Sequence, residues 1–246
     1  MVSTLYAFGD SFTLGDQDDF LEESKSSPSH QMSYDDRIEF LKYNVSFISH
    51  ISKVINVNLK NFAVRGSGNF PQLDKLWQNV KNKTITKDDI VFFGFSSWSR
   101  DRLSIADHKR VYSFDFGPCM IDKELFNTHE LHSIQIIDLF QILSSLMCLQ
   151  SFVGFKLVCL QMFDALEYRE DCFDLFSQFN FYIEGGRPGF TSIDILNDTW
   201  SQNIKYDGNH VKIDPPRQYQ HLYTINRHPS ILGHKKISDF LLNYFQ

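Results

Sequence analysis

Residues 2–12 read VSTLYAFGDSF and join an apolar run to a short turn that contains a glycine, an aspartate and a serine. The apolar run from Val2 to Phe8 predicts a β-strand that ends at Gly9. A serine on a sharp turn after such a strand, as Ser11 is here, can present its hydroxyl at the edge of a sheet. Glycine permits the tight backbone of that turn, and nearby N–H groups can face a developing oxyanion. The alternative is that Asp10 and Ser11 form an ordinary turn or a helix N-cap.

Beyond this stretch, apolar runs alternate with segments of helical periodicity. Further strands are predicted at residues 57–64, 90–95 and 155–162, and helices at 43–56, 70–80, 129–150, 164–179 and 231–245. Strands that alternate with helices indicate a parallel sheet covered on both faces. We therefore expect an α/β fold with a three-layer α/β/α arrangement and a mainly parallel central sheet. In such sheets ligands bind beyond the carboxyl ends of the strands.

The composition fits one domain spanning residues 1–246. Of its 246 residues 42% are hydrophobic and 22% are charged, as is usual for a globular protein with a sizeable core. No internal repeat and no linker divides the chain. Segments at about 13–40 and 97–128 are predicted to be insertions, and residues 181–227 are predicted to be irregular because they contain several glycines and prolines.

Charge and hydropathy exclude several classes of protein. A net charge of −6 and an isoelectric point near 5.8 argue against nucleic-acid binding, which usually needs a basic face. No run of 18 apolar residues occurs, so no membrane span is expected; residues 134–149 come nearest, and polar side chains interrupt them. No secretory signal is visible, and the four cysteines lack C-x-x-C spacing. We expect a cytoplasmic chain with reduced thiols.

Four short motifs, in order along the chain, resemble blocks of the SGNH/GDSL hydrolase family. They are Gly9-Asp10-Ser11-Phe12, Asn61 followed after four residues by Gly66, Phe93-Gly94-Phe95-Ser96-Ser97 in place of the family's Gly-x-Asn-Asp, and His228-Pro229 before the last predicted helix. The first and last motifs are specific, and the third is degenerate. The resemblance covers nearly the whole chain and implies the family's flavodoxin-like fold.

The resemblance also implies a role for each matching residue. Ser11 would be the nucleophile, and His228 would be its general base. The backbone N–H groups of Ser11 and Gly66 would form two arms of an oxyanion hole. The family's third donor is an asparagine side chain, and Ser96 stands at that position here. A serine hydroxyl has a shorter reach, so Asn69, close to Gly66 in sequence, is a possible substitute.

A second departure concerns the acid that orients the histidine. The family pattern is Asp-x-x-His, and Ile225 stands three residues before His228. Either the site is a Ser–His dyad, or a backbone carbonyl or the side chain of Asn226 or Asp207 orients the imidazole. Asp207 belongs to a separate Asp-x-x-His sequence that ends at His210, but neither a proline nor a predicted helix follows it.

Three other sequence signals resemble ligand sites but are interpreted as structural. His129 and His132 lack metal-binding helix spacing, and Gly66-Ser67-Gly68 lacks the rest of a nucleotide-binding loop. The acidic run after Gly15 lacks the spacing of a calcium loop. Arg65 and Arg100 either pair with acids of the fold or bind an anionic group of a substrate. No cofactor and no metal ion is expected.

Together the motifs predict a serine ester hydrolase that cleaves a small acyl ester, with a glycan ester among the substrates considered. The alternative is a non-catalytic or weakly active binding or assembly module on the same fold, because fold alone does not establish activity. The partner expected is a small-molecule or glycan ester substrate, and the sequence leaves the oligomeric state open.

Overall fold

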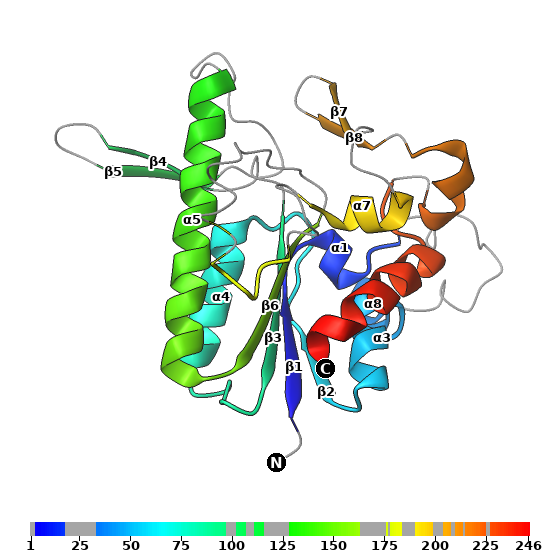
Figure 1. The fold of residues 1–246 in the computed structure, drawn as a ribbon, viewed down its shortest axis with the longest axis horizontal. Helices are drawn as coiled ribbons and strands as arrows, with labels where there is room; N and C mark the ends of the chain where they lie inside the picture. Colours follow the sequence, from blue (N-terminus) through cyan, green and yellow to red (C-terminus); the bar gives the residue numbers. More distant parts are fainter. Residues whose placement is uncertain are drawn as a thin grey trace.

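The computed structural model describes residues 3–17, 33–96, 102–106, 111–115, 128–162, 176, 178–183, 190–198, 204–207, 210–213, 215–224 and 227–246. Within these ranges a four-stranded sheet forms the centre of the molecule (Figure 1). Its strands are β1 (Thr4–Phe8), β2 (Asn58–Asn61), β3 (Ile90–Phe95) and β6 (Lys156–Gln161). Their order is β2-β1-β3-β6, and each neighbouring pair is parallel. The predicted α/β fold with a parallel central sheet is confirmed.

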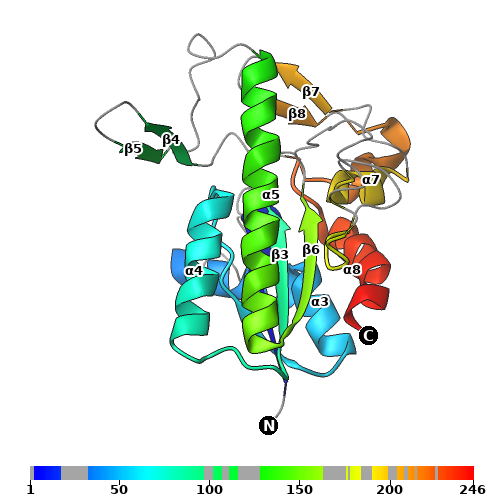
Figure 2. The same ribbon diagram turned by 60° about the vertical axis from the view of Figure 1, so that its left-hand side comes forward.

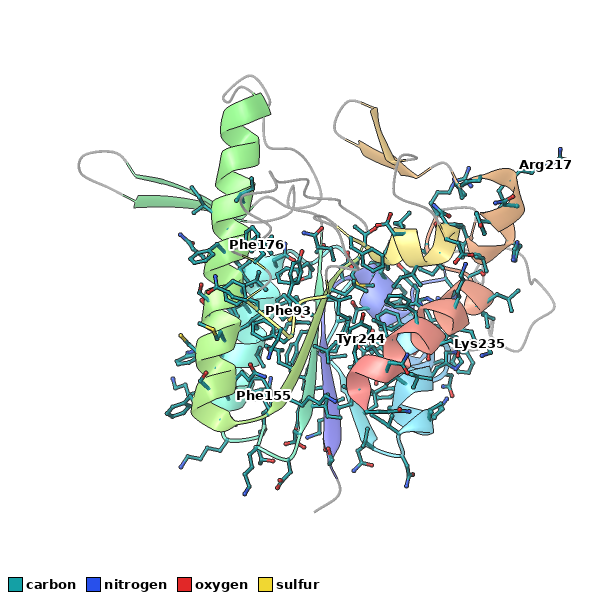
Figure 3. All side chains as sticks on the ribbon, viewed as in Figure 1. Phe93, Phe155, Phe176, Arg217, Lys235 and Tyr244 are labelled. Atoms are coloured by element: carbon teal, nitrogen blue, oxygen red, sulfur yellow. The ribbon has the colours of Figure 1, made fainter. Side chains whose placement is uncertain are left out.

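Helices cover both faces of this sheet and complete three layers. On one face lie α4 (Asn69–Lys81) and α5 (Thr128–Val153), and on the other lie α3 (Phe47–Val54) and α8 (Ile231–Phe245) (Figures 1 and 2). The strand period of two divides the core between these layers. Phe93 of β3 packs in the cluster on the α4 and α5 side, as Figure 3 shows, whereas Phe92 packs edge-on against Phe47 of α3.

Helix α5 is long and apolar enough to cross a membrane by length and composition alone. Its stretch Ile136–Val153 has a mean hydropathy of 1.7. One side of this stretch packs in the core, through Leu139, Ile142, Leu143, Leu146 and Leu149. Core helices of globular proteins pass the same test of length and composition, and α5 forms part of one layer of the fold (Figure 1).

Several element boundaries differ from those predicted. Strand β2 is shorter than the predicted 57–64. Beyond Asn61 the chain makes isolated hydrogen bonds with the end of β1: Phe62 N–H donates to Ala7 O at 2.8 Å, and Val64 N–H donates to Gly9 O at 3.0 Å. The predicted helix 43–56 is a π-helical turn, η3 (Leu41–Val45), followed by α3. Ser46 separates the two, since its hydroxyl caps α3 by accepting from Ser49 N–H.

The predicted insertions and the irregular segment contain regular elements. Residues 13–40 include the end of α1 (Ser11–Leu14) and α2 (Tyr34–Phe40), and residues 97–128 include the hairpin of β4 (Arg102–Ala106) and β5 (Val111–Asp115). Residues 181–227 include α7 (Ser192–Asn197), the hairpin of β7 (Ile204–Asp207) and β8 (His210–Ile213), and a 3₁₀ turn, η5 (Arg217–Leu222). A capping box of Thr191 and Asp194 starts α7, and this signal was missed in the sequence. The predicted helix 164–179 lies mostly outside the described residues.

The strand order places the ends of three strands beside one another. Strand β1 lies between β2 and β3, so the chain adds β2 on one side of β1 and then crosses over to add β3 on the other side. This is the topological switch point at which open α/β sheets bind their ligands. Ser11, Gly66 and Ser96 follow β1, β2 and β3 respectively, and they therefore share this edge of the sheet.

Candidate active site

Ser11 is the first residue of α1, on the turn that directly follows β1. Asp10 caps this short helix, because its carboxylate accepts from Phe12 N–H at 3.0 Å. Only glycine fits before it: a Cβ on Gly9 would lie 2.3 Å from Thr13 Oγ1, and Gly9 has a φ of +154°. The two interpretations of this turn, an N-cap and a serine presented at the sheet edge, are thus compatible, because the Asp10 cap fixes the backbone that carries Ser11.

His228 reaches Ser11 from the other end of the chain. The distance between His228 Nε2 and Ser11 Oγ is 3.0 Å, across 217 residues of sequence. This lies within hydrogen-bond range, so the predicted approach of the two side chains is present. The ring of Phe12 packs against the imidazole, with 5.4 Å between ring centroids. Phe12 therefore limits how far the imidazole can swing away from Ser11.

A tight turn between η5 and α8 carries His228. Thr224 N–H donates to His228 O at 2.8 Å, and the Thr224 hydroxyl accepts from His228 N–H at 3.2 Å. Arg227 completes the turn in the left-handed conformation, with φ of +67°. Ser230 then caps α8 by accepting from Gly233 N–H. The backbone on both sides of His228 is therefore held in place.

Gly66 lies on the loop that follows β2, next to the Ser11 turn. Val64 N–H donates to Gly9 O at 3.0 Å, so the two segments run side by side. Gly66 has a φ of +70°, and a Cβ placed on it would meet nothing within 4 Å. Among the described residues no acceptor takes its N–H, so that donor is not used in the sheet. The α-carbon of Gly66 therefore borders open space, as is expected at a position whose N–H is proposed to donate to an oxyanion.

Asn61 and Gln72 hold this loop against the Ser11 turn. Asn61 Nδ2 donates to Thr13 O at 3.2 Å, and its Oδ1 accepts from Ala63 N–H. Gln72, on α4, accepts from Gly9 N–H at 3.2 Å and donates to Ser67 Oγ at 2.7 Å. Gln72 was not recognised in the sequence, because a helix glutamine gives no pattern that distinguishes it from a surface residue.

Asn69 and Ser96, the two candidates for the third donor, are bonded to each other. Asn69 Oδ1 accepts from Ser96 N–H at 2.6 Å, and Asn69 Nδ2 donates to Ser96 O at 3.3 Å. The Ser96 hydroxyl donates to Asp10 Oδ2 at 3.0 Å. All three side chains are buried, so the Ser11 turn is tied to the end of β3 through a polar network.

Arg65 and Asp16 form an ion pair at the border of the site, with 2.5 Å between Arg65 Nε and Asp16 Oδ2. Burial raises the pKa of the Asp16 carboxyl, and the neighbouring Arg65 guanidinium partly opposes this rise. Of the two interpretations of Arg65, the structure shows the pairing with an acid of the fold. Arg100 lies outside the described residues.

The residues considered for orienting the imidazole are only partly described. Ile225 and Asn226 lie outside the described residues. Asp207 is the last residue of β7 and pairs with His210 in the hairpin drawn above α7 in Figure 1. Within the described ranges no group of three or more His, Cys, Asp or Glu side chains is arranged to hold a metal ion.

Comparison with known proteins found similar structures but no sequence match. No family model and no curated protein matches the chain. A solved structure described as a lipolytic protein of the G-D-S-L family, from Desulfitobacterium hafniense DCB-2, is 9% identical, with 98% of this chain and 99% of that chain covered and a TM-score of 0.47. A carbohydrate esterase is 14% identical, with coverages of 99% and 68% and a TM-score of 0.45.

A G-D-S-L lipolytic protein from Veillonella parvula DSM 2008 is 12% identical, with coverages of 99% and 98% and a TM-score of 0.42. The structural neighbours thus include the class of protein that the motifs resemble. Identities and scores this low carry no chemistry from one protein to another. What the site can do has to be judged from this chain's own residues.

Proposed function

We propose that the chain is a serine ester hydrolase. The observation that carries this proposal is the 3.0 Å contact between Ser11 Oγ and His228 Nε2 at the topological switch point of the sheet. A serine hydroxyl is a weak nucleophile until a neighbouring base accepts its proton, and an imidazole at this distance can do so.

In the proposed reaction, Ser11 Oγ attacks the ester carbonyl carbon while His228 Nε2 takes its proton. The resulting imidazolium then gives this proton to the leaving alcohol, and an acyl group remains on Ser11. Water attacks the acyl-enzyme, again with His228 as the base, and the acid is released. Nε2 must be unprotonated at the start, so the imidazole proton has to be on Nδ1.

The oxyanion formed in each step is assigned to three donors. Two are the backbone N–H groups of Ser11 and Gly66, and the open space beside Gly66 favours the second of these. For the third donor we favour Asn69 over Ser96, because an amide N–H reaches further than a serine hydroxyl and the Ser96 hydroxyl already donates to the Asp10 carboxylate at 3.0 Å.

The proposed substrate is an ester with a small acyl group, on a sugar or on another alcohol. Ser11 is only 3% exposed, at the base of the turn beside Phe12, so a bulky acyl group would have little room.

Hydrolysis of p-nitrophenyl acetate tests the proposal, with Ser11→Ala and His228→Ala as variants and Ser145→Ala as a serine control. We expect the rate of hydrolysis to fall in both active-site variants by at least about a thousand-fold, as in other serine hydrolases. Ser145 lies within α5 and its hydroxyl donates to Gln141 O of the same helix, so Ser145→Ala should keep most of the activity. Equal rates for the wild type and Ser11→Ala would favour the binding-module alternative.

A further inference from the structure

Asp16 and Gln17, which follow α1, contact the Ser11 turn, the loop after β2 and the turn that carries His228. We call this pair the clip. The chain turns at Gly15, which has a φ of +92°, and the N–H groups of Gly15 and Asp16 both donate to Ser11 O, at 3.1 and 3.0 Å. A Cβ on Gly15 would lie 2.8 Å from the backbone of Ser46, so the turn is pressed against the start of α3. The clip is therefore fixed to the backbone of the proposed nucleophile.

The first member of the clip holds the loop that carries Gly66. Asp16 pairs with the Nε of Arg65, the residue directly before Gly66. Asp16 is 2% exposed, whereas the Arg65 side chain is 39% exposed. A buried carboxylate is costly unless it is paired, so this contact ties the Arg65 backbone, and with it Gly66, to the Ser11 turn.

The second member of the clip holds the turn that carries His228. Gln17 Nε2 donates to Pro229 O, the carbonyl of the residue directly after His228, across 212 residues of sequence. Gln17 is 6% exposed, so water competes little for this bond. Pro229 also pairs with Tyr223 in an isolated antiparallel bridge. The His228 turn is thus held from two sides, by the bridge to Tyr223 and by Gln17.

From these contacts we infer that Asp16 and Gln17 are positioning residues, which keep the Gly66 arm and the His228 base in register with Ser11. The inference rests on the proposed hydrolase function. Neither side chain is placed to touch the reacting atoms. Each acts through another residue: Asp16 through Arg65, and Gln17 through Pro229. A displacement of about 1 Å at reacting groups can cost about a hundred-fold in rate, so contacts of this kind matter for turnover.

The role of Gln17 is tested with Gln17→Met and Gln17→Glu. Methionine keeps most of the volume and the packing, and glutamate keeps the size but replaces the N–H donor by an oxygen that repels Pro229 O. We expect kcat for p-nitrophenyl acetate to fall about 10- to 100-fold in both variants, with KM changed by less than about twofold, because alignment is lost and binding is not. Ile85→Val is the control for lost stability, since Ile85 is a buried core residue outside the site.

The same variants have a readout that does not depend on turnover. The imidazole Hε1 signal of His228, assigned with His228→Ala, should shift or broaden in Gln17→Met and should stay unchanged in Ile85→Val. Asp16→Asn is the complementary variant. It weakens the hold on Arg65, so kcat should fall about tenfold while the His228 signal stays as in the wild type.

The outcomes separate the inference from the proposed function. A wild type without esterase activity, whose His228 signal still responds to Gln17→Met, would remove the hydrolase proposal and keep the positioning role of Gln17. An unchanged His228 signal together with an unchanged kcat in Gln17→Met would overturn the inference. Loss of activity in Ile85→Val equal to that in Gln17→Met, at matched melting temperatures, would also overturn it, because general destabilisation would then account for both.

Discussion

Asn69 shows how one side chain can serve both the fold and the proposed reaction. Its Oδ1 holds Ser96 N–H at 2.6 Å, and its Nδ2 is the donor that we assign to the oxyanion. The amide is 1% exposed, so both functions take place away from bulk water, where hydrogen bonds are stronger. Because Nδ2 also donates to Ser96 O at 3.3 Å, a substitution at Asn69 should affect the fold and the reaction together.

We predict that Asn69→Asp loses the reaction and also lowers stability, because it places a buried carboxylate oxygen against Ser96 O. Aspartate retains an acceptor for Ser96 N–H, but it replaces the donor by an oxygen that repels the oxyanion. Turnover should fall by about a hundred- to a thousand-fold, the effect of removing one oxyanion donor. Steady-state kinetics on p-nitrophenyl acetate and thermal melting measure the two effects. Asn69→Ala is the comparison variant, which should lose both activity and about 1–3 kcal/mol of stability because Ser96 N–H is left buried without its acceptor.

Ser96 provides the contrasting case at the same scale. If its bond to Asp10 is its main function, Ser96→Ala should reduce turnover much less than Asn69→Asp does. A larger loss in Ser96→Ala would assign the third donor to Ser96, as the family pattern at this position suggests. The kinetic comparison of the two variants, on one substrate and at one pH, decides between them.

At the scale of elements, the junction of β1, α1 and β3 depends on two glycines facing one threonine. A Cβ on Gly94 would lie 2.4 Å from Thr13 Oγ1, and a Cβ on Gly9 would lie 2.3 Å from the same atom. Thr13 is fully buried, and its hydroxyl has no hydrogen-bond partner among the described residues. Helix α1 can therefore pack this closely against the strand ends only because both neighbours lack side chains.

This packing predicts a double-mutant coupling. Gly94→Ala should destabilise the protein by about 1–3 kcal/mol through overpacking against Thr13. Thr13→Ala removes the clashing oxygen, so Gly94→Ala should cost much less in that background. Thr13→Val keeps the shape of the side chain and should not rescue Gly94→Ala. Urea unfolding of the single and double variants measures the coupling. Additive effects would show that the Thr13 side chain is not what the Cβ of Gly94→Ala meets.

The elements differ in how far the sequence could predict them. The central strands and the last helix were predictable because their apolar periodicity is strong, and α8 runs from Ile231 to Phe245 as expected. Segment 181–227 was predicted to be irregular, and its described part contains α7: the glycines and prolines obscured this helix, whose capping box was the signal to notice. The Ser11 and His228 pairing was predictable only through the motifs. The bonds of Gln17 and Gln72 were not predictable, because they join residues far apart in sequence and belong to no motif.

At the scale of the whole molecule, the layer of α3 and α8 encloses a histidine that should make stability depend on pH. His234 is fully buried and stacks on Phe47, with ring centroids 6.1 Å apart. Burial lowers the pKa of His234 to about 3, and the nearby His50 and His228 add to the shift. In the unfolded chain the same imidazole titrates near its usual pKa of about 6.5. Between these two pKa values the unfolded state binds one more proton than the folded state.

We therefore predict that wild-type stability contains a component that is complete above about pH 6.5 and decreases as the pH falls toward 3. The expected slope is about 1.4 kcal/mol per pH unit within that window. His234→Leu should remove this component. Asp138 opposes it in both proteins, because burial raises its pKa to about 6 and the folded state then holds the extra proton.

The measurement is urea unfolding of the wild type and of His234→Leu at pH 7.5, 6.0 and 5.0. Because Asp138 is present in both proteins, its effect cancels in the difference between their unfolding free energies. As the pH falls, the unfolding free energy of His234→Leu should rise relative to that of the wild type. A difference that does not change with pH would show that His234 becomes protonated within the fold.

The central claim is that Ser11 is activated by His228, and covalent labelling tests it most directly. The protein is incubated with a fluorophosphonate, digested and analysed by mass spectrometry to locate the adduct. We expect one phosphonyl adduct, on Ser11, formed in the wild type and slowed by at least about a hundred-fold in His228→Ala, since the serine then lacks its base. Labelling of another residue, or labelling of Ser11 at the same rate in both proteins, would contradict this claim.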